Sequence, residues 1–250
     1  MTTEELIAAR RAEPWREALR KSKKNKERTD IPRVEMNELD AEYRSHTRLE
    51  EVNLGLTKEQ AMQEAQRCLD CPNPTCMQGC PVSINIPTFV KNIERGEFLE
   101  AARVLKETSA LPAVCGRVCP QEKQCESKCI HLKMGKPAVA IGYLERFAAD
   151  YERESGNISI PEVAEKNGIK IAVVGSGPAG LSFAGDMAKR GYDVTVFEAL
   201  HEIGGVLKYG IPEFRLPNKI VDVEIEGLRK MGVKSVSYTH LRAHETGAYL

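Results

Sequence analysis

Residues 68–81 read CLDCPNPTCMQGCP, and residues 115–129 read CGRVCPQEKQCESKC. These two stretches contain all eight cysteines of the 250-residue chain. The first block holds Cys68, Cys71, Cys76 and Cys80, and the second block holds Cys115, Cys119, Cys125 and Cys129. Two blocks of four thiols in one chain indicate metal binding, and the rest of the sequence is interpreted around them.

The spacing of the thiols favours iron–sulfur clusters. Thiolates hold a 4Fe-4S cluster, usually one per iron, and the Cys80-Pro81 step resembles the bacterial ferredoxin run, in which the last cysteine of one block ligates the other cluster. The match is imperfect, because four residues separate Cys71 from Cys76 where ferredoxins have two. Two structural zinc sites, each with four cysteine ligands, are the main alternative, although zinc ribbons usually use C-x2-C twice and the chain has one such pair.

Composition and charge narrow the class of protein. The 36 basic residues balance the 36 acidic ones, so the net basic field that attracts nucleic acid is absent. No run approaches the roughly 18 apolar residues of a membrane helix, and the first 15 residues lack the apolar core of a secretory signal. We therefore expect a cytoplasmic protein, in which clustered cysteines bind metal more often than they form disulfides.

The regions around the cysteines are predicted to be helical. Residues 1–38 read as a charged helical arm with a basic run at 21–26, which is typical of a solvated face and, less often, of an arm that docks on a partner subunit. A capping box at residues 57–60 predicts a helix that ends near Cys68. A pair of helices over 88–108, broken near Gly96, would bring the two blocks together.

Glu145 has two interpretations from its spacing alone. The next helix is predicted to begin at Pro137, and it would place Ala138, Ile141, Glu145 and Ala148 on one face. The carboxylate could reach water at the edge of this apolar stripe, or it could be buried as a ligand or as a partner of a charge. The spacing favours water, because carboxylates are rarely buried unpaired.

A polar linker over 156–168 precedes a βαβ unit of the dinucleotide-binding type. It comprises a buried strand over 169–174, a G-x-G-x-x-G turn over 175–180, a helix over 181–190 and a strand over 193–197. The turn consists of Gly175, Ser176, Gly177, Pro178, Ala179 and Gly180. A motif between a strand and a helix indicates a bound dinucleotide, whereas an ordinary βα turn is the alternative.

Each conspicuous residue of this unit has an expected task. Gly175 permits the tight turn, Gly177 lets the backbone approach a pyrophosphate, and Gly180 lets the helix pack on the strand. Glu198 ends the second strand and is expected to accept hydrogen bonds from ribose hydroxyls. The pair Gly204-Gly205 could approach a ligand, although by itself it reads as a turn. The motif does not separate FAD from NAD.

Together these residues resemble the small (beta) subunit of NADPH-dependent glutamate synthase. The resemblance covers residues 39–234, and the wider family shares this module with the N-terminal part of dihydropyrimidine dehydrogenase and the large subunit of electron-bifurcating ferredoxin:NADP oxidoreductase. The segments that carry it are CLDCPNPTCMQGCP, PAVCGRVCPQEKQCESKC, AIGYLERF, VVGSGPAGL and VFEALHEIGGVLKYGIPEFRLP. It implies an α-helical domain with two 4Fe-4S clusters over 39–155, followed from residue 169 by an α/β Rossmann-like FAD-binding domain.

The resemblance also implies ligand sets. The clusters would share ligands between the blocks, one using Cys68, Cys71, Cys76 and Cys129, and the other using Cys80, Cys119, Cys125 and Glu145. Cys115 would lie near the clusters without binding iron, although a simple two-block arrangement with Cys115 as the eighth ligand stays open. In the flavin domain, Gly175 to Gly180 would hold the FAD pyrophosphate, and Glu198 its ribose. Gly204, Gly205 and Arg215 would approach the flavin half.

By resemblance, electrons would pass from NADPH to FAD, then to the clusters, and on to the large (alpha) subunit of glutamate synthase. Subunits of ferredoxin-linked, bifurcating or pyrimidine-reducing enzymes are the enzymatic alternatives, and an electron-transfer or scaffold module is the non-enzymatic one. We expect no membrane or nucleic-acid partner. We assign no residue to acid–base catalysis, since the cofactors carry out the redox chemistry.

The end of the sequence departs from the family. The family has a second glycine-rich nucleotide motif beyond this point, where its NADPH site would lie, but this chain contains one G-x-G-x-x-G. Residues 236–246, VSYTHLRAHET, resemble the translation of a sequencing-library adapter, so we expect residues 235–250, with His240 and His244, to be non-native. The chain by itself is expected to be inactive and to hold FAD poorly. Stoichiometric FAD on purified residues 1–250 would contradict this expectation.

Overall fold

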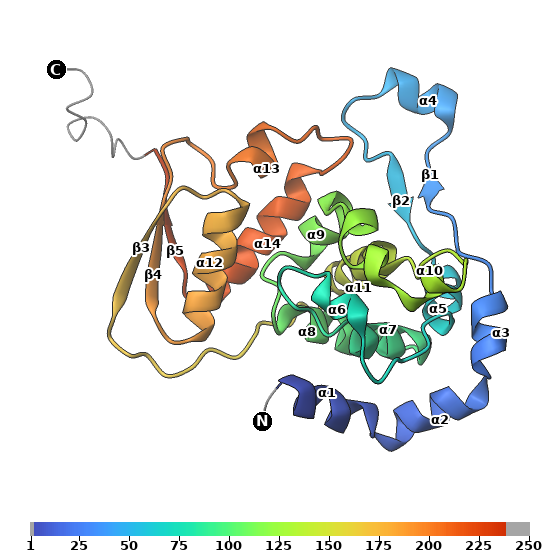
Figure 1. Ribbon diagram of the computed structural model, residues 1–250. Helices are drawn as coiled ribbons and strands as arrows, with labels where there is room; N and C mark the ends of the chain where they lie inside the picture. Colours follow the sequence, from blue (N-terminus) through green and yellow to red (C-terminus); the bar gives the residue numbers. More distant parts are fainter. Residues whose placement is uncertain (1–2, 239–250) are drawn as a thin grey trace. The chain divides into compact units, whose positions relative to one another are not determined.

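The computed structural model describes residues 3–238 as two compact units (Figure 1). The helical unit comprises Met1–Arg44 and Val52–Ser159, and the α/β unit comprises Ser45–Glu51 and Ile160–Leu250. The two histidines of the expected tail, His240 and His244, lie outside the described residues. Within residues 3–238, every helix is too short or too polar to span a bilayer.

The helical unit is built around one core of packed helices. Phe89, Ile93, Leu105 and Leu144 are completely buried in it, and the rings of Phe98 and Phe147 meet edge to face with centroids 5.1 Å apart. The helices of this core are α5 (Lys58–Gln66), α6 (Thr75–Gln78), α7 (Ile86–Glu94), α8 (Phe98–Lys106), α9 (Pro112–Val118), α10 (Ile130–Lys133) and α11 (Ile141–Ser155). Short 3-10 turns η1 (Gln121–Lys123) and η2 (Glu126–Lys128) connect the cysteines of the second block.

Two local predictions for this unit are confirmed. Thr57 and Gln60 form the capping box of α5, because the Thr57 hydroxyl accepts from the Gln60 N–H at 3.2 Å and the Gln60 side chain accepts from the Thr57 N–H at 2.8 Å. The break between α7 and α8 lies at Gly96, whose φ of +85° is in the left-handed region.

The predicted start of α11 is wrong. The helix begins at Ile141 and not at Pro137, because the preceding segment bonds to α5 instead. Arg67 donates to the carbonyls of Pro137 and Ala138, and the Ala140 N–H donates to Glu64 at 2.7 Å. These contacts hold the backbone before Ile141 in a non-helical path.

The N-terminal arm packs on the helical unit. Its helices are α1 (Thr3–Arg11), α2 (Pro14–Ser22) and α3 (Asn25–Asp30), and they lie along α5, α7 and α8 (Figure 1). Arg10 forms a paired contact with Glu107 at 2.8 Å on both nitrogens, and Arg16 and Arg28 are buried against acidic partners. A short antiparallel ribbon follows, with β1 (Asn37–Glu38) paired to β2 (Asn53–Gly55) and α4 (Ala41–His46) between them.

The α/β unit contains a three-stranded parallel sheet. The strands β3 (Lys170–Val174), β4 (Asp193–Phe197) and β5 (Lys234–Val236) lie in that order, with Lys170 opposite Asp193 and Thr195 opposite Lys234. The helices are α12 (Pro178–Lys189), α13 (Val206–Tyr209) and α14 (Asn218–Lys230). The β5 strand includes two residues of the expected non-native tail, Ser235 and Val236.

The prediction that the first strand of this sheet is buried is wrong. In β3 Val173 alone is buried, and Val174 is 75% exposed. The strand order places β3 at an edge of the sheet with a single neighbouring strand. An apolar run such as IKIAVV therefore does not establish burial on both faces, which parallel strands gain only when helices cover both sides.

Candidate iron–sulfur and nucleotide sites

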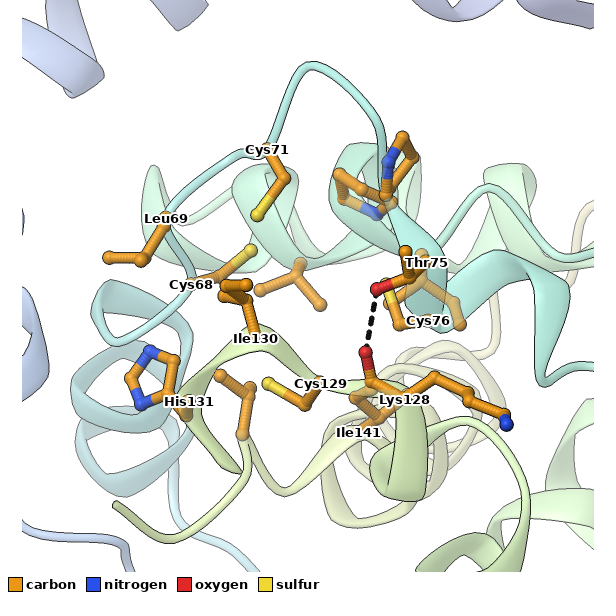
Figure 2. A pocket seen from close by; sticks show the side chains of 15 residues that line it. Cys68, Leu69, Cys71, Thr75, Cys76, Lys128, Cys129, Ile130, His131 and Ile141 are labelled. Atoms are coloured by element: carbon orange, nitrogen blue, oxygen red, sulfur yellow. Dashed lines mark hydrogen bonds between the residues drawn. The ribbon is translucent and has the colours of Figure 1, made fainter. Parts of the chain in front are cut away.

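Four thiols from both cysteine blocks line one pocket of the helical unit (Figure 2). Cys68, Cys71 and Cys76 come from the first block, and Cys129 comes from the end of the second block. We call these four residues the first group. The rest of the pocket is mainly apolar, with lining side chains that include Ile86, Pro87, Val90, Ile130, Val139 and Ile141.

Two contacts explain why the blocks meet. The Thr75 hydroxyl donates to the Lys128 carbonyl at 2.7 Å, which joins the residue before Cys76 to the residue before Cys129 (Figure 2). Gly79 lies against the backbone of the second block, where an added Cβ would come within 2.6 Å of the Gln124 carbonyl oxygen. The approach of the two loops therefore depends on a residue without a side chain at position 79.

The pocket makes thiolates unfavourable unless a cation compensates for them. Burial raises the pKa of Cys68 to about 11. Burial, reinforced by the negative charges of Cys68, Cys129 and Cys71, raises the pKa of Cys76 well above its usual range. Iron bound in this pocket would replace the thiol protons and supply the missing positive charge, so the donor set fits an iron–sulfur cluster.

The remaining predicted ligands influence one another electrostatically. We call Cys80, Cys119, Cys125 and Glu145 the second group. Burial, followed by the charges of Glu145 and Glu126, raises the pKa of Cys125 to about 12. Burial and the charges of Glu145 and Cys119 also raise the pKa of Cys80. Glu145 is 6% exposed on α11, so the interpretation in which its carboxylate reaches water is wrong.

Cys115 lies one helical turn before Cys119 at the end of α9. A hydrogen bond from the Cys115 thiol lowers the pKa of Cys119 to about 7, although burial acts in the opposite direction. Gly116 lets α9 cross α11 closely, because its Cβ would come within 2.5 Å of the Arg146 backbone nitrogen. This crossing brings the end of α9 to the part of α11 that carries Glu145. Among residues 3–238, no three His, Cys, Asp or Glu side chains are arranged to hold a single metal ion.

The glycine turn of the α/β unit has the expected geometry. Gly175 adopts a φ of +94°, and an added Cβ at Gly180 would lie 2.1 Å from the Gly175 carbonyl oxygen. A Cβ at Gly177 would meet nothing within 4 Å, so the backbone there faces open space that could admit a phosphate. Pro178 occupies the first turn of α12, where its missing N–H costs nothing, and Ala179 beside it is exposed.

The side chain of Glu198 contacts the glycine turn. Its Oε2 accepts from the Ser176 N–H at 2.8 Å and from the Ser176 hydroxyl at 2.5 Å, and its Oε1 accepts from the Leu200 N–H at 3.0 Å. Burial opposes ionisation, but these hydrogen bonds outweigh it and lower the pKa of Glu198, so it is an anion at neutral pH. The Glu198 carboxylate thus holds the glycine turn in place through Ser176, and it lies beside the turn where a nucleotide ribose is expected.

The Gly204-Gly205 pair contacts the turn directly. The Gly204 N–H donates to the Ser176 hydroxyl at 2.9 Å, and a Cβ at Gly205 would lie 2.8 Å from the Cα of Gly177. Both glycines have positive φ, so the pair forms a tight turn that packs on the backbone of the glycine turn. Its approach to a ligand stays a prediction. Arg215 is different, since it lies exposed in the turn before α14, and its backbone N–H donates to the Pro212 carbonyl.

A Gly180→Ala substitution tests the helix–strand contact at the turn. The new methyl group would overlap the Gly175 carbonyl, and we expect the α/β unit to lose about 2 kcal/mol of stability. Gly177→Ala is the matched control, because its methyl group enters open space. Site-resolved hydrogen exchange in β3 and β4 measures the effect. Equal protection in the two variants would contradict the assigned packing role of Gly180.

The sequence did not reveal the residues that hold the cysteine loops. Asp70, Thr75, Gly79 and Lys91 all contact these loops, but their partners are far away in the chain. A charged residue inside a C-x2-C loop, such as Asp70, was the one visible signal. It indicates a buried charge that needs a partner, without identifying that partner.

Comparison with known proteins identifies both units. Residues 44–157 match the family described as dihydropyrimidine dehydrogenase domain II, 4Fe-4S cluster. Residues 173–233 match the NAD(P)-binding Rossmann-like domain. The chain is 41% identical over 185 residues to the NAD-dependent dihydropyrimidine dehydrogenase subunit PreT of Escherichia coli (strain K12), covering 74% of this chain and 44% of that protein.

The chain is also similar to glutamate synthase (NADPH) small chains. It is 36% identical over 183 residues to that of Azospirillum brasilense, covering 73% of this chain and 38% of the relative. It is 40% identical over 176 residues to that of Escherichia coli (strain K12), covering 70% and 37%. Over 70–74% of its length the chain is thus similar to proteins of both groups.

The two domain matches bear on two of the alternatives that the sequence left open. The domain description favours a 4Fe-4S cluster over structural zinc, and the second domain is of the nucleotide-binding Rossmann type. The chain spans less than half the length of the relatives it matches. The sequence resemblance to glutamate synthase small chains is thereby confirmed.

Proposed function

We propose that the chain is part of an NAD(P)H-dependent iron–sulfur flavoprotein subunit of the glutamate synthase class. The observation that carries this proposal is the convergence of Cys68, Cys71, Cys76 and Cys129 on one apolar pocket, in a chain that also contains a dinucleotide turn. The first group would hold one 4Fe-4S cluster. The second group, with Glu145 in place of a fourth thiolate, would hold another.

The α/β unit would bind FAD. The open space at Gly177 supports a pyrophosphate beside the turn, and the N-terminus of α12 would stabilise its charge. Glu198 would accept from the ribose hydroxyls while Ser176 holds its carboxylate in place. When bound, flavin and clusters supply the conversion of a two-electron donor, NADPH in this proposal, into single electrons. The protein residues position these groups and keep water from the apolar pocket.

The partner in this proposal is the large (alpha) subunit of glutamate synthase. A pyrimidine-reducing partner is the second candidate, because identity to PreT is 41% against 36% and 40% for the two glutamate synthase small chains. A ferredoxin-linked or bifurcating oxidoreductase subunit is a further alternative.

Reconstitution of the complete protein with each candidate partner distinguishes these possibilities. We expect NADPH-dependent formation of glutamate from 2-oxoglutarate and glutamine with the large subunit. Dihydropyrimidine formation would assign the protein to the pyrimidine-reducing class. If the complete protein reduces no electron-accepting dye with either NADPH or NADH, the oxidoreductase proposal is contradicted. The non-enzymatic alternative, an electron-transfer or scaffold module, would then be favoured.

A further inference from the structure

The loop that carries Cys68 and Cys71 is held by arginines from the N-terminal arm. Asp70, between the two cysteines, is completely buried and has a φ of +53°. Its carboxylate accepts from Arg16 at 2.5 Å and from Arg20 at 2.7 Å, and its carbonyl accepts from Arg11 at 2.9 Å. Three cations from the arm therefore converge on a loop of four residues.

A buried lysine approaches the same loop from the other side. Lys91 on α7 is completely buried, and its Nζ donates to the Cys68 carbonyl at 2.6 Å and to Glu94 at 2.5 Å. Glu94 also accepts from the buried Arg28 at 2.8 Å. We call the five cations of this network the cationic layer: Arg11, Arg16, Arg20, Arg28 and Lys91. Two carboxylates, Asp70 and Glu94, oppose them, so the layer has excess positive charge.

The surroundings of the second group are closer to charge balance. Glu126 lies beside Cys125 and pairs with Arg33 at 2.8 Å. Arg117 and Arg146, on α9 and α11, share the carboxylate of Asp150. Arg153 also contacts Asp150 at 3.2 Å and pairs with Glu154 at 2.9 Å. Four cations thus face three carboxylates, before the negative charge of Glu145 itself is counted. The two groups therefore differ in the charge held around them.

Reduction of a cluster adds one negative charge, so nearby positive charge favours the reduced form. The potentials of iron–sulfur clusters depend on the net charge, hydrogen bonds and solvent exposure around them. Charges buried with little water act more strongly than exposed ones, which salt and water screen. Arg16, Arg28 and Lys91 are all at most 1% exposed, so water and salt screen their effect on a nearby cluster only weakly.

We propose that the cationic layer gives the cluster at the first group the higher reduction potential of the two. An electron that enters this domain then comes to rest at the first group before the second group is reduced. This inference rests on the proposed function, because it needs a 4Fe-4S cluster at each group. It assigns Lys91 and the arm arginines as positioning residues that act through the Cys68–Cys71 loop.

The test is a redox titration of the anaerobically purified chain, followed by electron paramagnetic resonance. Lys91→Gln removes the charge but keeps an N–H donor for the Cys68 carbonyl, and Glu94 keeps its bond to Arg28. We expect at least a tenfold drop in the ratio of reduced to oxidised first cluster at a fixed potential, which is about 59 mV for one electron. The second signal, identified as the one missing from Glu145→Ala, should shift less.

Three further variants make this test specific. Lys91→Arg keeps the charge and should retain the potential. Lys21→Gln removes a charge of the same sign from an exposed ion pair with Glu17 and should leave both potentials unchanged. If Lys91→Gln loses iron, Arg20→Gln replaces it, because the Arg20 side chain is 21% exposed and less needed for packing.

Two results would overturn the inference. One is a ratio that changes less than twofold in an iron-replete Lys91→Gln or Arg20→Gln variant, and the other is a first cluster that is reduced after the second in the unmodified chain. Iron analysis separates these from failure of the proposed function. About four irons per chain instead of about eight would show that one of the two clusters is absent, before any titration is made.

Discussion

Gly79→Ala is expected to remove most of the iron from the purified chain. The new methyl group would lie 2.6 Å from the Gln124 carbonyl oxygen, 2.9 Å from its carbon and 3.0 Å from the Cα of Cys125. All three are backbone atoms, so no side chain can rotate to make room. The two loops must separate, which moves Cys76 and Cys80 away from Cys125 and Cys129. We expect a loss of roughly 2–3 kcal/mol in stability and impaired assembly at both groups.

The backbone at Gly79 makes this prediction specific to the contact. Its φ of −86° is one that alanine adopts readily, so strain in the chain does not contribute. Gly227→Ala is the matched control, since its methyl group would meet nothing within 4 Å on α14. That variant should keep its iron and gain about 0.5–1 kcal/mol from helix propensity. Iron and acid-labile sulfide per chain measure the outcome. Normal iron content in Gly79→Ala would contradict the assigned contact between the blocks.

Local patterns in the sequence predicted much of the fold. The capping box at Thr57, the break at Gly96 and the glycine turn after β3 each depend on residues close together in the chain. The start of α11 was not predictable, because Arg67 and Glu64, about 70 residues earlier, compete for the backbone groups near Pro137. Long-range hydrogen bonds of this kind override local helix signals.

The candidate site was partly predictable for the same reason. Cysteine spacing revealed the donors, but the spacing around Glu145 favoured a carboxylate that reaches water, which the structure contradicts. The resemblance to the family then suggested how the donors are divided. The packing of the N-terminal arm was harder to predict. Its basic run at residues 21–26 indicated a solvated face, whereas the buried contacts are made by Arg16 and Arg28. The partners of these arginines lie far along the chain: Asp70 is 54 positions after Arg16, and Glu94 is 66 positions after Arg28. Ion pairs over such separations leave no periodic signal in the sequence.

We propose that two clusters share ligands across the blocks, with Glu145 as a ligand and Cys115 outside both ligand sets. Glu145 is buried and influences the pKa of both Cys80 and Cys125, whereas Cys115 donates a hydrogen bond to Cys119. Loss of a ligand at the second group should release that cluster and leave the first group filled. Loss of the Cys115 thiol, which serves only as a hydrogen-bond donor in this arrangement, should leave both clusters in place.

Iron and sulfide content of Glu145→Ala and Cys115→Ser, produced anaerobically beside the unmodified chain, tests this claim most directly. We expect about eight irons per chain in the unmodified protein and in Cys115→Ser, and about four in Glu145→Ala. Electron paramagnetic resonance of the reduced samples should show one signal missing from Glu145→Ala alone. The reverse pattern, with iron lost from Cys115→Ser and retained in Glu145→Ala, would contradict the shared arrangement and establish one cluster for each block.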